Sequence, residues 1–153
     1  MKKIAIVAAL LAAAWVLPAA AAGRGCYSAK DLEAEQALLF LTNLMVASSA
    51  CQHNDAYAEF ALRNRYAILA YQKAMIDHFR RAGFRRPQSA FDRWNTSLAN
   101  QISLQEGALP IAQMCQKAAD LFKLANTLDS AGFRKYAAAR AQSAVLSHPR
   151  CGR

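Results

Sequence analysis

Acidic residues are scarce in this chain, and the short motifs of common catalytic sites are missing. Only 10 residues are Asp or Glu, against 19 Lys and Arg. No carboxylate pair has the spacing typical of glycoside chemistry, and there is no Gly-x-Ser-x-Gly turn, phosphate-binding glycine loop or dinucleotide fingerprint. No Cys-x-x-Cys pair lowers a thiol pKa. These absences disfavour the familiar hydrolase, nucleotide-dependent and dithiol redox classes.

Metal and haem sites also lack support. The three histidines are His53, His78 and His148, and none has the spacing of a zinc motif. Covalent haem attachment would need Cys-x-x-Cys-His, which is absent. Noncovalent haem would need His78, the only histidine in a predicted helix, together with a methionine. We therefore expect no metal and no cofactor.

The first 22 residues have the pattern of a cleaved secretory signal peptide. Lys2 and Lys3 form a short basic start, residues 4–17 are apolar, and Ala20–Ala22 supply small residues before a cleavage site at Gly23. Cleavage removes two lysines, which lowers the formal net charge from +9 to +7. We predict that residues 23–153 form a single domain, periplasmic or secreted, with no membrane span after cleavage.

Beyond the signal, the apolar spacing is helical almost throughout, and no segment has the alternation of a strand. Ser28 with Asp31, and Ser89 with Asp92, have the spacing of capping boxes at helix starts. The pattern predicts an all-α, up-and-down bundle of four long helices plus a shorter fifth, stapled by two disulfides. The expected ranges are 29–50, 54–83, 89–105, 110–128 and 133–145.

Four cysteines, Cys26, Cys51, Cys115 and Cys151, remain in the exported chain and can pair in three ways. A straight helix over 29–50 would hold Cys26 and Cys51 roughly 30 Å apart, far beyond the ~7 Å that a disulfide tolerates between Cα atoms. Of the two remaining pairings, we prefer Cys51–Cys115 with Cys26–Cys151. Cys51 and Cys115 lie on core-facing stripes, and the other bond joins the two ends of the domain.

Basic residues concentrate at the predicted helix ends. Residues 82–86, AGFRR, resemble residues 131–135, AGFRK, and both segments read as a glycine cap followed by cations. In an up-and-down bundle the second and fourth helices end at one pole. We therefore predict a basic pole formed by Arg80, Arg81, Arg85, Arg86, Arg134 and Lys135. Compensation of the two helix dipoles, together with solubility, explains these charges more simply than a docking face for an anionic partner does.

The leading functional hypothesis is a non-enzymatic helical protein that binds or scaffolds an envelope component through the basic pole. An anionic envelope component or an acidic protein is the expected partner, and nucleic acid is not. The composition resembles that of small alanine-rich periplasmic proteins of Gram-negative bacteria. The alternative is a small periplasmic enzyme whose site is assembled from dispersed residues. A cavity shared by Asn64, Tyr71 and His78 would favour the enzyme.

Overall fold

A computed structural model describes residues 25–144 and 149–151 of the chain. The predicted signal peptide, residues 1–22, and its cleavage site lie outside the described residues, as do His148 and the predicted end of the last helix at residue 145. Among the described residues, the only β-type pairing is an isolated bridge between Tyr27 and Arg150. The all-α prediction is therefore confirmed.

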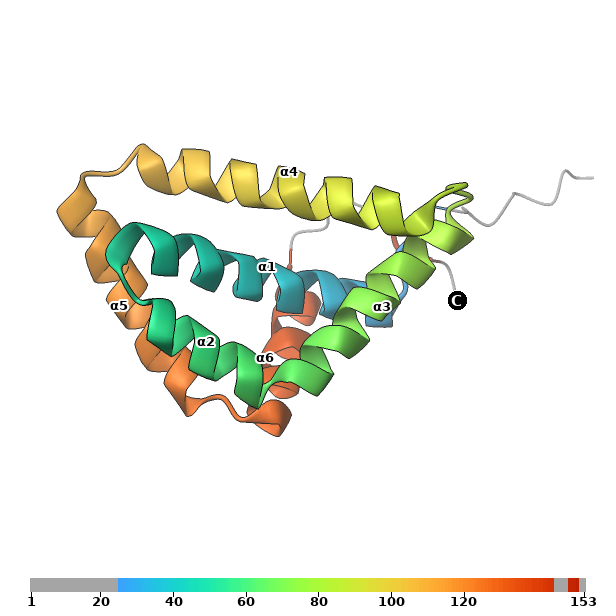
Figure 1. Ribbon diagram of the computed structural model, residues 1–153. Coiled ribbons are helices and arrows are strands. Elements are labelled where there is room, and N and C mark those ends of the chain that lie inside the picture. The colour runs from blue at the N-terminus through green and yellow to red at the C-terminus, as the bar shows by residue number, and fades with distance from the viewer. Residues whose placement is uncertain (1–24, 145–148, 152–153) are drawn as a thin grey trace, which may run out of the picture.

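The described residues form six helices, one more than predicted. The structure has them in the order α1 (Ala29–Cys51), α2 (Asn54–Arg63), α3 (Arg65–Arg81), α4 (Pro87–Gly107), α5 (Ile111–Thr127) and α6 (Ser130–Ser143). The count differs because the predicted helix over 54–83 is divided at Asn64 into α2 and α3, which meet at a bend (Figure 1).

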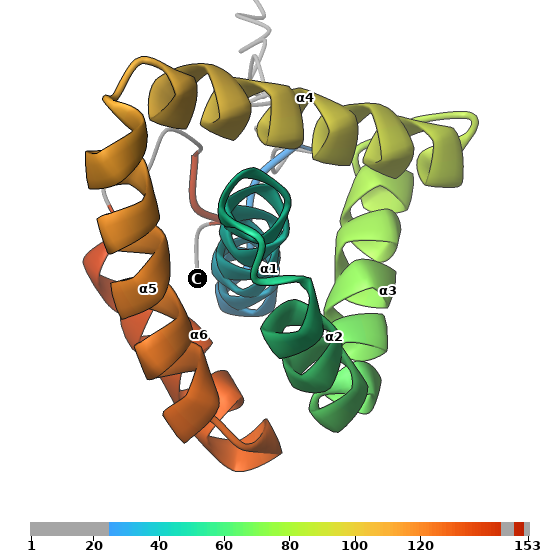
Figure 2. The same ribbon diagram turned by 60° about the vertical axis from the view of Figure 1, so that its left-hand side comes forward.

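Helix α1 runs through the middle of the molecule and contacts all five other helices. Viewed nearly along its axis, α4 crosses above it while α3 and α5 flank it (Figure 2). Aromatic side chains from α1, α2 and α6 meet in the core, where the ring centroids of Phe60 and Phe133 lie 5.2 Å apart and those of Phe40 and Phe60 5.7 Å apart. Such edge-on pairs add to the burial of large apolar area in holding the helices together.

The bend at Asn64 has a local cause. The Asn64 side-chain amide donates to the carbonyl of Phe60, at 3.1 Å, and to that of Leu128, at 3.4 Å. Arg63 donates to the carbonyls of Ala125 and Leu128. Carbonyl groups at the C-terminal end of α5 therefore accept hydrogen bonds from the α2–α3 junction, in addition to the bond that Ala125 accepts from the Leu128 N–H. An asparagine side chain that competes for a helix carbonyl, together with this docked helix end, interrupts the helix.

The helix starts were predicted with mixed success. The Ser28–Asp31 capping box is confirmed, with Asp31 N–H donating to Ser28 Oγ and Ser28 N–H donating to Asp31 Oδ2. The second predicted box is wrong, because α4 begins at Pro87 and Ser89 already lies within its first turn. Proline suits that first position, since it has no N–H to leave unsatisfied.

The two glycines of the similar segments have opposite roles. Gly83 has φ of 89° and follows the end of α3, where the Phe84 N–H donates to the Phe79 carbonyl, as predicted for a C-terminal cap. Gly132 lies instead in the first turn of α6, and its N–H donates to the Asp129 side chain at 2.7 Å. The prediction that Gly132 ends or bends the preceding helix is therefore wrong.

The preferred pairing of the cysteines is the one that the structure contains. Cys51–Cys115 joins the last residue of α1 to α5, and Cys26–Cys151 joins the segments that precede α1 and follow α6. Two backbone hydrogen bonds reinforce the second disulfide, from Tyr27 N–H to the Pro149 carbonyl and from Cys151 N–H to the Tyr27 carbonyl. The two disulfides are compatible with an extracellular or secreted protein.

Candidate functional site

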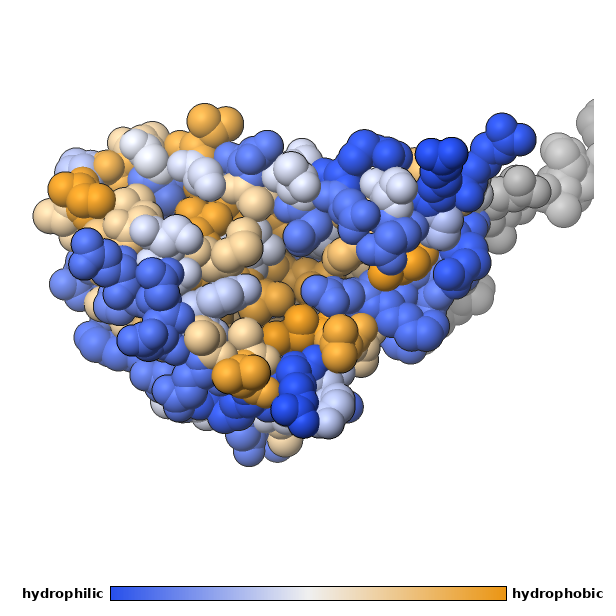
Figure 3. Space-filling model, in the orientation of Figure 1, coloured by the Kyte–Doolittle hydropathy of each residue, from blue (hydrophilic) through white to orange (hydrophobic). Residues whose placement is uncertain are grey.

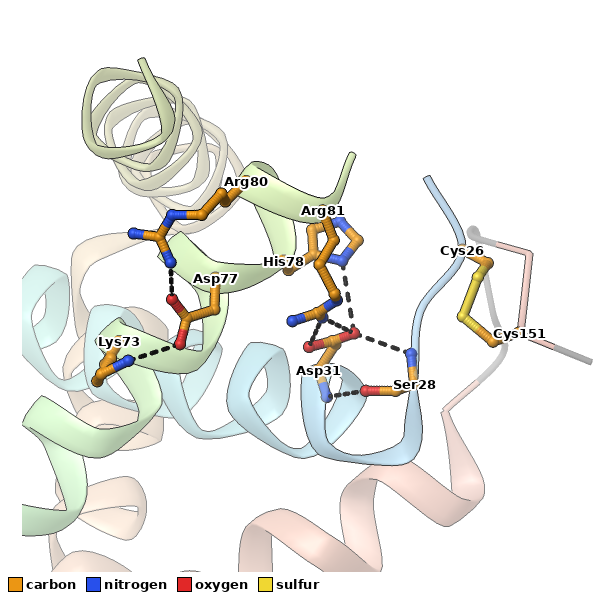
Figure 4. Close-up of polar contacts among 9 residues, drawn as sticks. All are labelled: Cys26, Ser28, Asp31, Lys73, Asp77, His78, Arg80, Arg81 and Cys151. Carbon is orange, nitrogen blue, oxygen red and sulfur yellow. Dashed lines mark hydrogen bonds and ion pairs between the residues drawn. A yellow bond between two sulfur atoms is a disulfide. The ribbon is translucent and has the colours of Figure 1, made fainter. Parts of the chain in front are cut away.

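The end of α3 and the start of α4 bring four of the predicted basic residues together. We call Arg80, Arg81, Phe84, Arg85 and Arg86 the basic corner. Arg80 and Arg81 belong to the last turn of α3, where cations oppose the negative end of the helix dipole. Arg80 also pairs with Asp77, which pairs in turn with Lys73 (Figure 4). Arg80 therefore contributes to the structure of α3 itself.

Arg81 holds α3 to the start of α1. Its Nη2 lies 2.7 Å from both carboxylate oxygens of Asp31, and the Asp31 side chain is only 3 % exposed (Figure 4). Burial alone would raise the pKa of the Asp31 carboxyl, but hydrogen bonds from Arg81 and Ser28 and the charge of Arg81 outweigh it and hold the pKa below its usual value. His78 Nδ1 lies 3.5 Å from Asp31 Oδ2. Asp31 is thus both a cap and a buried anchor for Arg81.

Arg85 and Arg86 differ from the other two arginines. Both are exposed, and neither takes part in an ion pair among the described residues. Arg86 is the N-cap of α4, whose first turn contains no acidic residue and receives no side-chain cap. The N-terminal end of a helix carries partial positive charge and unsatisfied N–H groups, so a cation there is unfavourable and an anion is favoured.

An aromatic side chain lies among these cations. Phe84 is 48 % exposed and packs edge-on against Phe79, with ring centroids 5.4 Å apart. Strongly hydrophilic side chains gather over the end of the molecule where α3 meets α4, whereas hydrophobic side chains appear around the opposite end of α4 (Figure 3). Exposed aromatic and arginine side chains are the types enriched in protein interfaces.

Two of the six predicted pole residues lie elsewhere. Arg134 lines a cleft between α1, α3 and α6, and its positive charge partly offsets the rise in the pKa of the Tyr71 hydroxyl. Tyr71 lies ten residues, roughly 15 Å along the helix, before the end of α3. Lys135 follows in the same exposed turn of α6. The predicted convergence is wrong because α5 ends at the α2–α3 bend and not beside the end of α3.

The three polar residues that would favour an enzyme are separated. Asn64 is buried at the bend, and His78 is buried one turn before the end of α3, with its ring 4.1 Å from that of Tyr27. Tyr71 lies between them and donates to Glu33 at 2.7 Å. Burial, followed by the hydrogen bond and charge of Glu33, raises the pKa of the Tyr71 hydroxyl. Tyr71 and His78 both face α1, but at separate places, whereas Asn64 contacts the end of α5.

A second feature, absent from the predictions, is an apolar cleft between α1, α4 and α5. It consists of two adjoining hollows of about 140 and 530 Å³ that share Val46, Glu106 and Met114. Apolar residues on three separate helices line it, and each helix alone shows only an amphipathic stripe. The spacing of these apolar residues therefore predicts that they are buried. The cleft between them arises from the angles at which the helices cross, and these angles cannot be recognised in the sequence.

The described part of the chain contains neither a cluster of metal-binding side chains nor a helix that could span a membrane. No grouping of three or more His, Cys, Asp or Glu side chains there could hold a metal ion. Of the helices α1 to α6, none has both the length and the apolar character to cross a membrane. Among known proteins, no family model, curated protein or solved structure matches the chain.

Proposed function

We propose that the protein is an exported, non-enzymatic binding protein that docks an anionic component of the cell envelope at the basic corner. The observation that carries the proposal is the position of Arg85 and Arg86. Their charges are placed at the N-terminal end of α4, where they oppose the dipole of that helix, so compensation of the α4 dipole does not explain them. Guanidinium groups, helix N–H groups and dipole all favour an anion at this place.

The neighbouring residues support a division of tasks within the corner. Arg80 and Arg81 pair with Asp77 and Asp31 and stabilise the fold, whereas Arg85 and Arg86 remain available to a partner. Phe84 adds an exposed apolar surface beside them. The alternative, an enzyme with a site built from Asn64, Tyr71 and His78, is disfavoured by their separation.

The test is a double charge reversal, Arg85→Glu with Arg86→Glu. Cosedimentation is measured at low salt with vesicles that contain phosphatidylglycerol, with neutral phosphatidylcholine vesicles as reference. Two arginines near an anionic surface contribute about 1 kcal/mol each, so we expect at least a roughly thirtyfold weaker association. A matched variant, Lys135→Glu with Arg140→Glu on the exposed face of α6, changes the net charge equally and should retain most of the binding.

Thermal melting separates this proposal from a structural role. Glutamates at the start of α4 complement the dipole, so the double variant should melt at the same temperature as the native protein or slightly above it. Unchanged vesicle binding together with earlier melting would overturn the proposal. If the native protein binds neither kind of vesicle, photo-crosslinking from residue 84 in exporting cells decides whether an acidic protein is the partner. Capture of no envelope component would also overturn the proposal.

A further inference from the structure

The apolar cleft lies where the continuous core of the protein ends. Of the buried residues of α4, Ala90 and Phe91 belong to that core, and both lie in its first turn and a half. Ile102 is buried but is not part of the same cluster. The second half of α4 therefore spans the groove between α1 and α5 without filling it.

The walls of the cleft suit a flexible aliphatic chain. Small side chains leave the space open, among them Ala47 and Ala50 on α1 and Ala99 on α4. Met45 and Met114 face the same hollow from α1 and α5. Methionine is unbranched and polarisable, so it adapts to an irregular apolar ligand. The second hollow continues toward Leu121 and Ala118 along α5.

The charged groups of the cleft balance each other. Lys117 Nζ donates to both carboxylate oxygens of Glu106, at 2.7 and 3.0 Å, and this pair connects α5 to α4. The Lys117 side chain is largely exposed and that of Glu106 less so. A neutral pair offers both a hydrogen-bond donor and an acceptor, and it favours neither an anionic nor a cationic head group. Its natural complement is an uncharged group with hydroxyls.

We propose that this cleft binds a medium-length acyl chain with an uncharged, hydroxyl-bearing head group, as found in a monoacylglycerol. The larger hollow has the size of an ordinary small-molecule site, and the smaller one extends it; such sites are mostly apolar with a few placed polar groups. The chain lies between α1, α4 and α5, and the head group reaches Glu106 and Lys117. This inference is independent of the basic corner, which lies at the other end of α4.

The first experiment is a chain-length series. Hexanoyl, octanoyl, decanoyl and lauroyl monoglycerides are titrated into the disulfide-bonded protein by calorimetry, below their aggregation concentrations. Burial of each methylene should strengthen binding about fourfold until the cleft is full. Affinity that does not depend on chain length, or no measurable binding of any member, would overturn the proposal.

A filled cleft provides the second test. Ser103 lines the cleft from α4 and is exposed, so Ser103→Trp fills the space without a change in the buried core. We expect at least a tenfold loss of decanoyl monoglyceride binding. Ser97→Trp, on the same helix but outside the cleft lining, is the matched control and should bind like the native protein. Equal binding by both variants contradicts the assignment, provided that both melt as the native protein does.

The head-group preference tests the role of the ion pair. The native protein should bind decanoyl monoglyceride more tightly than decanoate. Glu106→Gln removes the carboxylate and leaves Lys117 with a net positive charge, so the preference should shift toward decanoate by about tenfold. A native preference for decanoate, or no shift in the variant, would show that the pair does not select the head group.

Discussion

The two halves of α4 are held to the molecule in different ways. At its start, Ala90 and Phe91 are buried and Trp94 packs against Phe91 and Phe79, with ring centroids 5.9 and 6.5 Å apart. At its end, Ile102 alone is buried, and Leu104 is 77 % exposed. The basic corner therefore stands on a packed support, whereas the apolar cleft lies under a segment with few core contacts. Rigid placement suits surface recognition, and loose packing suits ligand entry.

Removal of one disulfide at a time should have the largest effects on stability, and it should show which disulfide supports the end of α4 beside the cleft. In the chain-entropy model, loss of either bond lowers the free energy of unfolding by about 4 kcal/mol. Cys51→Ser with Cys115→Ser should also weaken monoglyceride binding, because that bond fixes α1 against α5 beside the cleft. Cys26→Ser with Cys151→Ser should not. Urea unfolding and calorimetry measure the two effects, and equal loss of binding in both variants would contradict the distinction.

Truncation of one buried side chain in each half of α4 tests the difference in packing. Phe91→Ala should lower the free energy of unfolding by about 4 kcal/mol, because a large cavity forms within the continuous core. Ile102→Ala should cost only about 2 kcal/mol, since this residue borders space that is already open. Urea denaturation of both variants measures the ratio. Equal costs would mean that the second half of α4 is as tightly packed as the first.

The Asp31–Arg81 pair should make the basic corner sensitive to acid. Because the folded-state pKa of Asp31 is depressed, its contribution is present above its ordinary pKa of 3.8 and is lost as the pH falls through the lower, folded value. Asp31→Asn should destabilise the protein by about 2 kcal/mol at pH 7, less than for a fully buried pair because Arg81 is 54 % exposed.

The difference between Asp31→Asn and the native protein should shrink as the pH is lowered, which chemical denaturation at several pH values will show. Asp120→Asn, in an exposed pair with Lys123, is the control and should leave stability unchanged. A difference in the free energy of unfolding that persists at low pH would indicate that the variant is destabilised by its altered helix cap and not by the missing charge.

The smallest effect is expected at the other end of α4. Lys117→Met removes the ion pair with Glu106, which is solvent-exposed on the lysine side. Such pairs contribute less than about 1 kcal/mol and weaken with salt. Thermal melting at low and high ionic strength should therefore show a small destabilisation only at low salt. A loss as large as that of Asp31→Asn would show that this pair is a major link between α4 and α5.

Local features were the ones that could be predicted. The Ser28–Asp31 capping box and the Gly83 cap follow from local spacing, and helix geometry excludes one of the three cysteine pairings. Asn64 and Asn100 are both polar residues within predicted helices. Asn64 links helices by donating to the Leu128 carbonyl, whereas Asn100 is exposed. The spacing of an asparagine within a helix does not reveal whether a neighbouring helix end reaches it.

Residue order alone therefore sufficed for the helical class and for the arginines in the turn after α3, because each depends on contacts within a few turns of the chain. The disulfides join residues 125 and 64 positions apart, so the sequence narrowed their pairing to two possibilities and the tertiary structure decided between them. The bend at Asn64, the anchoring of Arg81 by Asp31 and the apolar cleft required the folded molecule. The bend depends on where α5 meets the α2–α3 junction, the anchor on where α3 crosses α1, and the cleft on where α4 and α5 cross α1. Crossing angles arise from the packing of many side chains at once. For that reason only four of the six predicted cations lie together at one end of the molecule, and the other two lie elsewhere.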